Sequence, residues 1–182
     1  MSEIIGITTD KQPLIKKITE DNIINLTGES GSGKSTFAKN YNKDFIIVDT
    51  DVIFGNQQPT KIYEIELKNY FQSKYQDNFK TSLYTNFDEI YDAILKYFSQ
   101  EKRTIVIDSA QFRNMKNIRK LKGTIIIMRT SIKTCLSRCI IRYHNNHPEA
   151  TKQEVIDYAN HKKEMLKSSI YLNEFIEKIV AL

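Results

Sequence analysis

The stretch Gly28-Glu29-Ser30-Gly31-Ser32-Gly33-Lys34-Ser35 decides how the rest of this 182-residue chain is interpreted. It satisfies every constrained position of the pattern G-x-x-x-x-G-K-[S/T]. An apolar, β-branched segment precedes it at 23–27, and a segment of helical character follows over 34–41. Glycines let successive backbone N–H groups turn toward one point, where, together with a helix N-terminus, they can hold phosphate oxygens. A strand before this loop and a helix after it are the context that confirms the motif.

With this loop in this context, the sequence resembles the P-loop NTPase superfamily. The resemblance implies that the chain binds ATP with Mg²⁺. In such a loop Lys34 reaches the β- and γ-phosphates, the Ser35 hydroxyl contacts Mg²⁺, and Thr36 is placed for the α-phosphate. The other nucleotide-binding positions that we expect are Gly28, Ser30, Gly31, Ser32 and Gly33. The loop alone does not choose between a kinase, an ATPase and a GTPase.

The rest of the chain alternates apolar runs with segments of helical character. The runs at 45–48, 104–107 and 124–128 are short and apolar throughout, as is typical of strands buried on both faces. This alternation predicts an α/β three-layer sandwich, in which a parallel sheet of four to five strands is covered by helices on both faces. We expect one kinase-like domain over residues 1–182, with a small helical lid at about 138–152. Ligands of such sheets bind at the carboxyl ends of the strands.

Several local signals predict where the helices begin and end. We expect a helix at 10–20, another from Pro59 to about Gln76, and a helical tail at 170–180 whose end, 178–182, is alternatively a fifth strand. Ser131 can cap a helix over 132–143. The remaining signals are two capping boxes, Asn86 with Glu89 and Thr151 with Glu154.

Two acids, Asp49 and Asp51, directly follow the second core strand. At that strand end they would face the same crevice as the glycine loop. One of them could accept a hydrogen bond from a substrate hydroxyl and take its proton as the γ-phosphoryl group is transferred. Asp49-Thr50-Asp51 resembles the D-x-D after the second strand of shikimate-kinase-like and gluconate-kinase-like enzymes. The alternative is an Asx turn or a helix cap that closes the strand.

A third acid, Asp108, ends the apolar run at 104–107 and matches the Walker-B pattern. Its carboxylate would hold Mg²⁺ through water. The segment that begins there, 108–113, has a faint resemblance to the D-G-F-P-R stretch of adenylate kinases, in which the arginine binds substrate phosphate. Arg113 lies one residue later than that pattern requires, and the Gly and Pro are missing, so Arg113 is a weaker substrate-site candidate.

Two arginines, Arg138 and Arg142, are spaced i, i+4 on the predicted helix after Ser131. This spacing puts both guanidinium groups on one helix face. The pair resembles the R-x-x-x-R at the lid of nucleoside-monophosphate-kinase-like enzymes, in which one arginine packs on the adenine and another reaches the phosphates. The resemblance implies that Arg138 lies beside the base and that Arg142 stabilises charge. A solvated basic helix face is the alternative.

Together these features predict an ATP-dependent phosphotransferase that moves the γ-phosphoryl group to a hydroxyl or phosphate of a small molecule or nucleotide. The proposed catalytic residues are Lys34, Asp49, Asp51, Arg138 and Arg142. A nucleotide-binding regulatory NTPase and a polynucleotide 5′-hydroxyl kinase remain alternatives, and a zeta-type toxin acting on a nucleotide sugar is a further possibility. The chain is too short for an AAA+ module with its helical domain, and no N-K-x-D guanine-reading motif occurs.

Composition sets weaker bounds on partners. A net charge of +5 is mild and scattered, so nucleic acid is a possible but not a favoured partner. No apolar run approaches the roughly 20 residues that cross a bilayer, and the first residues do not resemble a signal peptide, so we expect a cytoplasmic protein without a membrane partner. The two cysteines, Cys135 and Cys139, are expected to be buried free thiols.

Overall fold

The computed structural model describes residues 10–40, 44–167 and 170–182. Within them the chain forms a five-stranded sheet in the order β1-β5-β2-β4-β3. The strands are β1 (Leu14–Lys17), β2 (Ile23–Thr27), β3 (Ile46–Asp49), β4 (Ile105–Asp108) and β5 (Thr124–Ile127). Four of them are parallel, and β1 pairs antiparallel with β5 at the sheet edge. The predicted α/β class is confirmed, with one antiparallel strand added.

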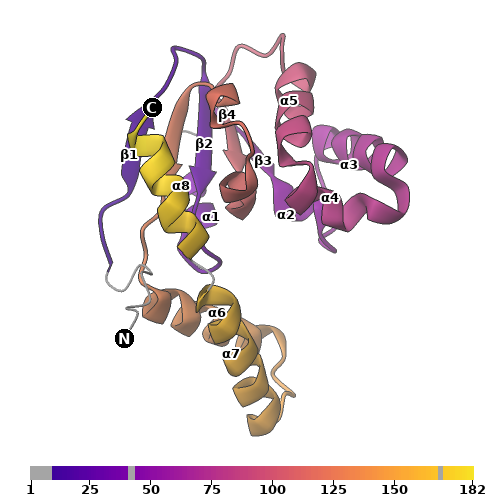
Figure 1. Ribbon diagram of the computed structural model, residues 1–182. Helices are drawn as coiled ribbons and strands as arrows, with labels where there is room; N and C mark the ends of the chain where they lie inside the picture. Colours follow the sequence, from indigo (N-terminus) through magenta and orange to yellow (C-terminus); the bar gives the residue numbers. More distant parts are fainter. Residues whose placement is uncertain (1–9, 41–43, 168–169) are drawn as a thin grey trace.

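Helices connect and cover the strands (Figure 1). They are α1 (Lys34–Lys39), α2 (Thr50–Phe54), α3 (Ile62–Tyr75), α4 (Phe79–Thr85), α5 (Phe87–Tyr97), α6 (Ile132–Asn146), α7 (Lys152–Lys167) and α8 (Ile170–Val180). Short 3₁₀ turns lie at η1 (Gln76–Asn78), η2 (Ala110–Asn114) and η3 (Ile118–Lys120). The helix after the glycine loop ends at Lys39 with Asn40 as its C-cap, and residue 41 of its predicted span lies outside the described residues.

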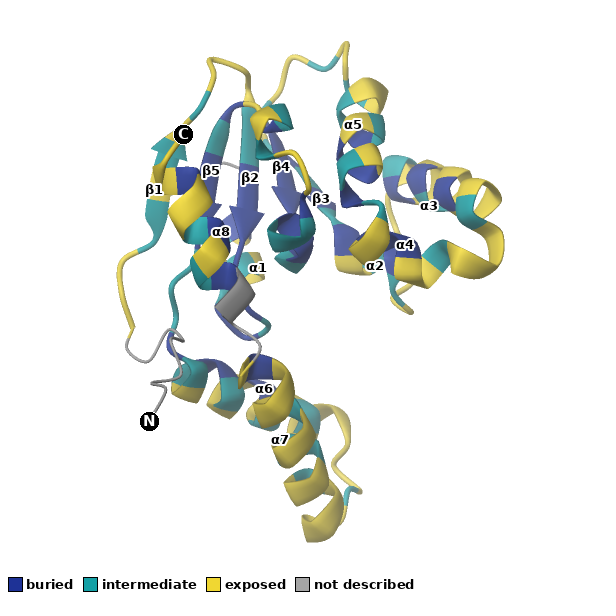
Figure 2. Ribbon diagram, in the orientation of Figure 1, coloured by how far each residue is buried: buried dark blue, intermediate teal, exposed yellow. Residues whose placement is uncertain are grey.

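The two faces of the sheet are separated by the alternation of side chains along each strand. Ile105 and Ile107 of β4 join the larger core, which also contains residues of α5 and α8, whereas Val106 points to the smaller core under α1. Each fully buried aliphatic side chain of this kind contributes about 1.5–3 kcal/mol. Figure 2 shows the sheet as the buried centre, with exposed helical surfaces outside it.

The predicted helix at 10–20 is wrong, because Leu14–Lys17 forms β1. This strand pairs with β5, whose backbone N–H and C=O groups would otherwise form an open sheet edge. The tail is a helix, so the alternative strand at 178–182 is also wrong. Lys16 links the two, since its Nζ donates to the carbonyl oxygens of Ile179 (3.0 Å) and Val180 (3.2 Å) at the end of α8.

The helix-start signals had mixed outcomes. The Ser131 cap is confirmed, because its Oγ accepts the Thr134 N–H at 3.2 Å. The Thr151–Glu154 box is confirmed by reciprocal bonds of 2.7 and 3.3 Å. The helix expected from Pro59 begins instead at Ile62.

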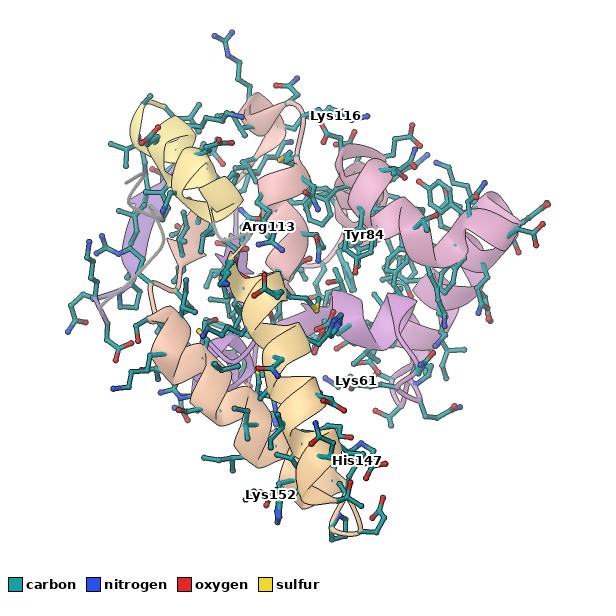
Figure 3. All side chains as sticks on the ribbon, turned by 60° about the horizontal axis from the view of Figure 1, so that its bottom comes forward. Lys61, Tyr84, Arg113, Lys116, His147 and Lys152 are labelled. Carbon is teal, nitrogen blue, oxygen red and sulfur yellow. The ribbon has the colours of Figure 1, made fainter. Side chains whose placement is uncertain are left out.

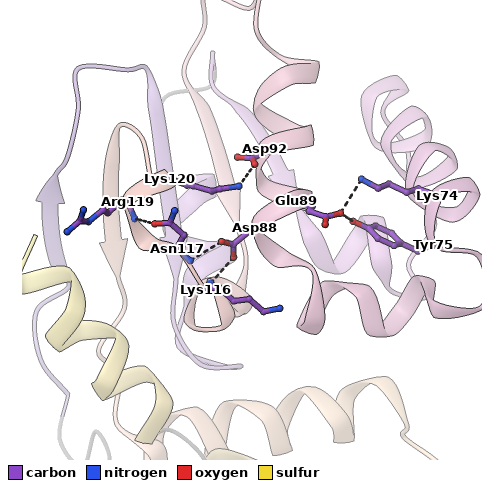
Figure 4. Close-up of polar contacts among 9 residues, drawn as sticks. All are labelled: Lys74, Tyr75, Asp88, Glu89, Asp92, Lys116, Asn117, Arg119 and Lys120. Carbon is purple, nitrogen blue, oxygen red and sulfur yellow. Dashed lines mark hydrogen bonds and ion pairs between the residues drawn. The ribbon is translucent and has the colours of Figure 1, made fainter.

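The Asn86–Glu89 box is wrong. The Glu89 carboxylate instead contacts Lys74 and Tyr75 of α3, both at 3.3 Å (Figure 4). Asn86 joins α4 directly to α5 and makes no side-chain cap. Tertiary partners on α3 therefore override the local capping signal.

None of the helices among the described residues combines the length and the apolar character needed to cross a bilayer.

Candidate active site

The glycine loop lies between β2 and α1, at the carboxyl end of the sheet. Gly28, Gly31 and Gly33 have φ values of 149°, 80° and 95°, a backbone region that favours glycine. At two of these positions a side chain would also have too little space. A Cβ at Gly28 would lie 2.8 Å from the Met128 Cβ, and one at Gly31 would lie 2.6 Å from the Cys135 carbonyl oxygen. The loop is therefore packed tightly against the end of β5 and the start of α6.

Lys34 is folded into this loop. Its Nζ donates to the carbonyl oxygens of Gly28 (2.9 Å) and Glu29 (3.2 Å). An ammonium group is thereby held inside the loop. Phosphate oxygens are stronger acceptors for it than these carbonyls, because they carry a negative charge that attracts the ammonium group.

Sheet register brings two of the predicted acids together. Asp49 at the end of β3 and Asp108 at the end of β4 are register partners on adjacent parallel strands. On its other side Asp108 pairs with Leu26 of β2, the strand that leads into the glycine loop. Asp108 therefore lies between the loop and the Asp49–Asp51 segment.

Asp108 contacts the residue after the loop lysine. The Ser35 Oγ donates to its Oδ2 at 3.4 Å, and the Asp108 side chain is buried. Burial raises the pKa of Asp108 to about 7, although the Lys34 ammonium opposes this shift. A nearby cation would therefore stabilise the charged form of Asp108, which burial otherwise disfavours.

The donor set here fits Mg²⁺. A hydroxyl and a carboxylate are hard oxygen ligands, and Mg²⁺ is usually bound by one or two carboxylates together with substrate phosphates. Among the described residues no group of three His, Cys, Asp or Glu side chains is placed to hold a metal. A cation held by Ser35 and Asp108 would therefore take its other ligands from phosphate and water, and would neutralise phosphate charge.

The Asp49–Asp51 segment caps a helix and also places one acid at the loop pocket. The Asp49 Oδ1 accepts the Asp51 N–H at 2.8 Å and caps α2, which matches the helix-cap alternative. Burial raises the pKa of Asp49 above its usual range. The exposed Asp51 side chain lines the same pocket as the glycine loop.

That pocket has a volume of about 120 Å³. Its lining residues come from the loop, α1, α2, the end of β4, η2 and α6, and they are Ser30, Gly31, Gly33, Lys34, Ser35, Thr36, Asp51, Asp108, Ala110 and Arg142. Loop, acid and arginine candidates from four separate parts of the sequence thus meet in one pocket.

Comparison with known proteins identifies the family of the chain. Residues 23–165 match the sequence model of an AAA domain family, AAA_33. The chain belongs to this family. It is a P-loop NTPase family that includes kinase-like members, such as those similar to shikimate and adenylate kinases. No curated protein matches the chain.

The match to AAA_33 shows a nucleotide-binding P-loop protein and leaves the reaction and the substrate open. Members of such families generally bind nucleotide with Mg²⁺. The length of the chain led us to expect that it is not an AAA+ module with a helical domain. Membership of AAA_33 does not decide this point, because the family includes kinase-like members. The roles of the individual site residues and the single-domain organisation stay predictions.

The two arginines of α6 both lie at the glycine loop. The Arg138 Nη1 donates to the Gly31 carbonyl oxygen at 3.2 Å, and Arg142 lines the loop pocket one turn later. On the same helix, Cys135 and Cys139 pack against Gly31 of the loop as buried free thiols, which confirms the expectation for both cysteines. Burial raises the pKa of Cys135 to about 11, so this thiol stays protonated.

The predicted lid, 138–152, forms the second half of α6 and the turn into α7. Figure 3 places His147 and Lys152 at the far tip of this hairpin, well away from Arg113. Tyr143 stacks on Tyr158 with ring centroids 4.1 Å apart, which joins the two helices.

Arg113 lies in a contact that the sequence did not suggest. Its Nη1 is 2.6 Å from the Glu29 Oε1, and both side chains are largely buried. Burial raises the pKa of Glu29, and the Arg113 charge opposes that shift. Glu29 occupies a variable position of the loop pattern, so the motif carried no signal for it. Arg113 therefore braces the glycine loop from η2, and its proposed contact with substrate stays untested.

A second unforeseen contact aligns the two acidic strand ends. The Thr50 Oγ1 donates to the Ser109 Oγ at 2.9 Å, and both residues are buried. Each follows an acid, Asp49 or Asp108, at matched positions of neighbouring strands. Two small hydroxyl residues at the same strand end are the signal that could have predicted this bond.

Proposed function

We propose that the chain is an ATP-dependent phosphotransferase that moves the γ-phosphoryl group to a hydroxyl or phosphate of a small molecule or nucleotide. One observation carries the proposal. Ser35 and Asp108 suffice for a cation beside the glycine loop, yet two further carboxylates, Asp49 and Asp51, gather at the same strand ends. Simple binding of nucleotide gives no reason for an exposed acid in the loop pocket, whereas deprotonation of an acceptor hydroxyl does.

The two acids receive different roles in this proposal. Asp51 lines the loop pocket, so we assign it to orient the acceptor hydroxyl and accept its proton. Asp49 caps α2 and thereby positions Asp51. The acceptor oxygen then forms a bond to the γ-phosphorus, the bond from that phosphorus to the bridging oxygen breaks, and ADP leaves with the electron pair. Lys34, Arg138 and Arg142 stabilise the charge of the phosphoryl group during transfer.

The test is a screen of hydroxyl-bearing acceptors with γ-labelled ATP and Mg²⁺. Asp51→Asn should lower transfer at least about 100-fold with ATP affinity unchanged, because an amide cannot take the proton. Asp49→Asn retains a cap oxygen and should lower transfer less. A larger loss of transfer in Asp49→Asn would mean that Asp49 accepts the proton and that Asp51 only positions it.

The rivals predict different outcomes of the same screen. A regulatory NTPase would label no acceptor, and its ATP hydrolysis would be unaffected by either substitution. A polynucleotide 5′-hydroxyl kinase would label oligonucleotides, and its binding would weaken steeply with salt. The cytoplasmic location expected from the sequence also stays a prediction.

A further inference from the structure

A second pocket adjoins the loop pocket, and the two share Asp51. Its volume is about 240 Å³, and it is lined by residues of α2, the following loop and α4. These residues, which we call the acceptor pocket, are Asp51, Phe54, Gly55, Asn56, Lys80, Leu83 and Tyr84. Asp51 therefore stands where the two pockets meet.

The acceptor pocket has an apolar floor and a polar rim. Phe54 and Leu83 are buried and form the floor. The Phe54 ring is held between Phe71 and Phe79, with centroid distances of 5.0 and 5.1 Å, so this floor is rigidly packed. By contrast, the Tyr84 side chain is exposed on α4, where Figure 3 labels it. An exposed aromatic ring beside an apolar floor offers a surface for a flat or ring-shaped ligand.

The rim also carries the positive charge of Lys80, and a second ammonium group, that of Lys68, is bonded to the lining residue Gly55. The Lys80 Nζ donates to the Asn56 Oδ1 at 3.1 Å, and the Lys68 Nζ donates to the Gly55 carbonyl oxygen at 3.2 Å. Both partners are neutral. None of the ion pairs between described residues includes Lys68 or Lys80. An ammonium group that donates to a neutral amide can still bind an anion more strongly.

We infer that the acceptor pocket binds a small, hydroxyl-bearing ring compound that carries an anionic group, with its hydroxyl toward Asp51 and its anionic group toward Lys80. The inference rests on the proposed function and adds the substrate class to it. The orientation follows from charge, because Asp51 would repel the anion that Lys80 attracts.

The pocket volume bounds the size of this compound. It is below the roughly 300–1,000 Å³ typical of pockets for drug-sized ligands. A monosaccharide or a nucleoside bearing one phosphate or carboxylate is of the right order, whereas a polymer could place only its end there.

The experiment compares matched acceptors that differ only in their anionic group. Sugars and nucleosides are tested alone, as their phosphates and as their carboxylates, with γ-labelled ATP. The variants are Lys80→Met, Lys80→Glu and Tyr84→Ala. Lys17→Met serves as the control, because Lys17 is on β1 at the opposite edge of the sheet from β3. Thermal unfolding of each variant reports whether it folds.

The anionic compounds should be the better acceptors. Lys80→Met should raise the KM of the best one about tenfold, which corresponds to the loss of one hydrogen bond to a charged group. Lys80→Glu should raise it further, while kcat and the KM for ATP change less than twofold. Tyr84→Ala should raise the KM of charged and neutral ring acceptors alike. The control should match wild type. Direct binding of the best acceptor by calorimetry should weaken in parallel.

Different failures separate the inference from the proposed function. If no compound accepts the label, the proposed function fails. If neutral acceptors are preferred, if Lys80→Met leaves the KM of an anionic acceptor unchanged, or if a 5′-hydroxyl oligonucleotide is the best acceptor, phosphotransfer stands and the inferred substrate class is overturned.

Discussion

The strand ends of the sheet and the α6–α7 hairpin both supply residues to the candidate site, but they are held in place differently. Asp49 and Asp108 are register partners in the buried sheet, so backbone pairing sets their positions. Arg142 lies on a helix whose most extensive helix contact is with α7, and its side chain is exposed. Figure 2 shows the same contrast, with a buried sheet and a hairpin that is largely exposed along its length.

The site therefore has two parts. The preorganised part consists of the acids and the glycine loop, which are fixed to the strand ends of the buried sheet, and the attached part consists of the arginines, whose positions depend on how α6 packs on the loop. The contact between the two parts, which we call the joint, involves few residues. It consists mainly of Cys135, Cys139 and Arg138 packed against Ser30, Gly31 and Gly33.

The largest effect is expected within the preorganised part. Lys34→Ala removes the cation that is hydrogen-bonded inside the loop, so ATP affinity and phosphotransfer should each fall about 1,000-fold or more. Equilibrium binding of a fluorescent nucleotide measures this change. Lys39→Ala, at the end of the same helix, is the control and should bind nucleotide as wild type does.

The next effect tests the joint. Gly31→Ala and Gly33→Ala both put a side chain at positive φ, at 80° and 95°, but only at Gly31 would the new Cβ lie 2.6 Å from the backbone of α6. At Gly33 the nearest atom is 3.5 Å away. Gly31→Ala should therefore cost about 2 kcal/mol more in unfolding free energy and displace Arg142 as well as the loop. Equal losses of stability would mean that α6 is not packed on the loop as described.

A smaller effect is expected in the attached part. Arg142→Ala should lower kcat about 10- to 100-fold with little change in Tm, because its exposed side chain carries charge rather than packing. Arg138→Ala should act more on the KM for ATP, since Arg138 lies against the loop backbone. Steady-state kinetics on the best acceptor separates the two. If kcat falls only together with a clear loss of Tm, the hairpin arginines act through folding alone.

The last effect is a gain in stability, whereas the three effects above are losses of activity or stability. Burial raises the pKa of Asp108 to about 7, so between pH 4 and 7 the folded state binds this proton more tightly than the unfolded state. Wild-type stability is then lost as pH rises through that range. Asp108→Asn, which carries no charge, should match wild type near pH 4 and exceed it above pH 7.

The expected gain above pH 7 is on the order of 2 kcal/mol, or about 4–8 °C in Tm. Thermal unfolding without nucleotide or Mg²⁺ measures it across the pH range, and nucleotide-dependent activity should fall in the same variant. A Tm difference that does not change with pH would contradict the assigned cause.

The fold was predictable to the extent that its signals are local. The four apolar runs, the glycine loop and the Ser131 cap depend on neighbours in sequence, and the structure confirms them. Two of the errors share one cause. Leu14–Lys17 became a strand because β5 had an open edge, and Glu89 left its capping position because α3 offered Lys74 and Tyr75. Partners distant in sequence override local propensity.

The sequence by itself determined the phosphate-binding loop and the residue types around it, because glycine at positive φ, a loop lysine and acids at strand ends are required by chemistry at known spacings. Only the tertiary structure decided which of these residues meet. Sheet register put Asp49 beside Asp108, burial joined Arg113 to Glu29, and the packing of α2 against α4 created a pocket at Asp51. None of these contacts is encoded at a fixed spacing, since each depends on how separate elements pack.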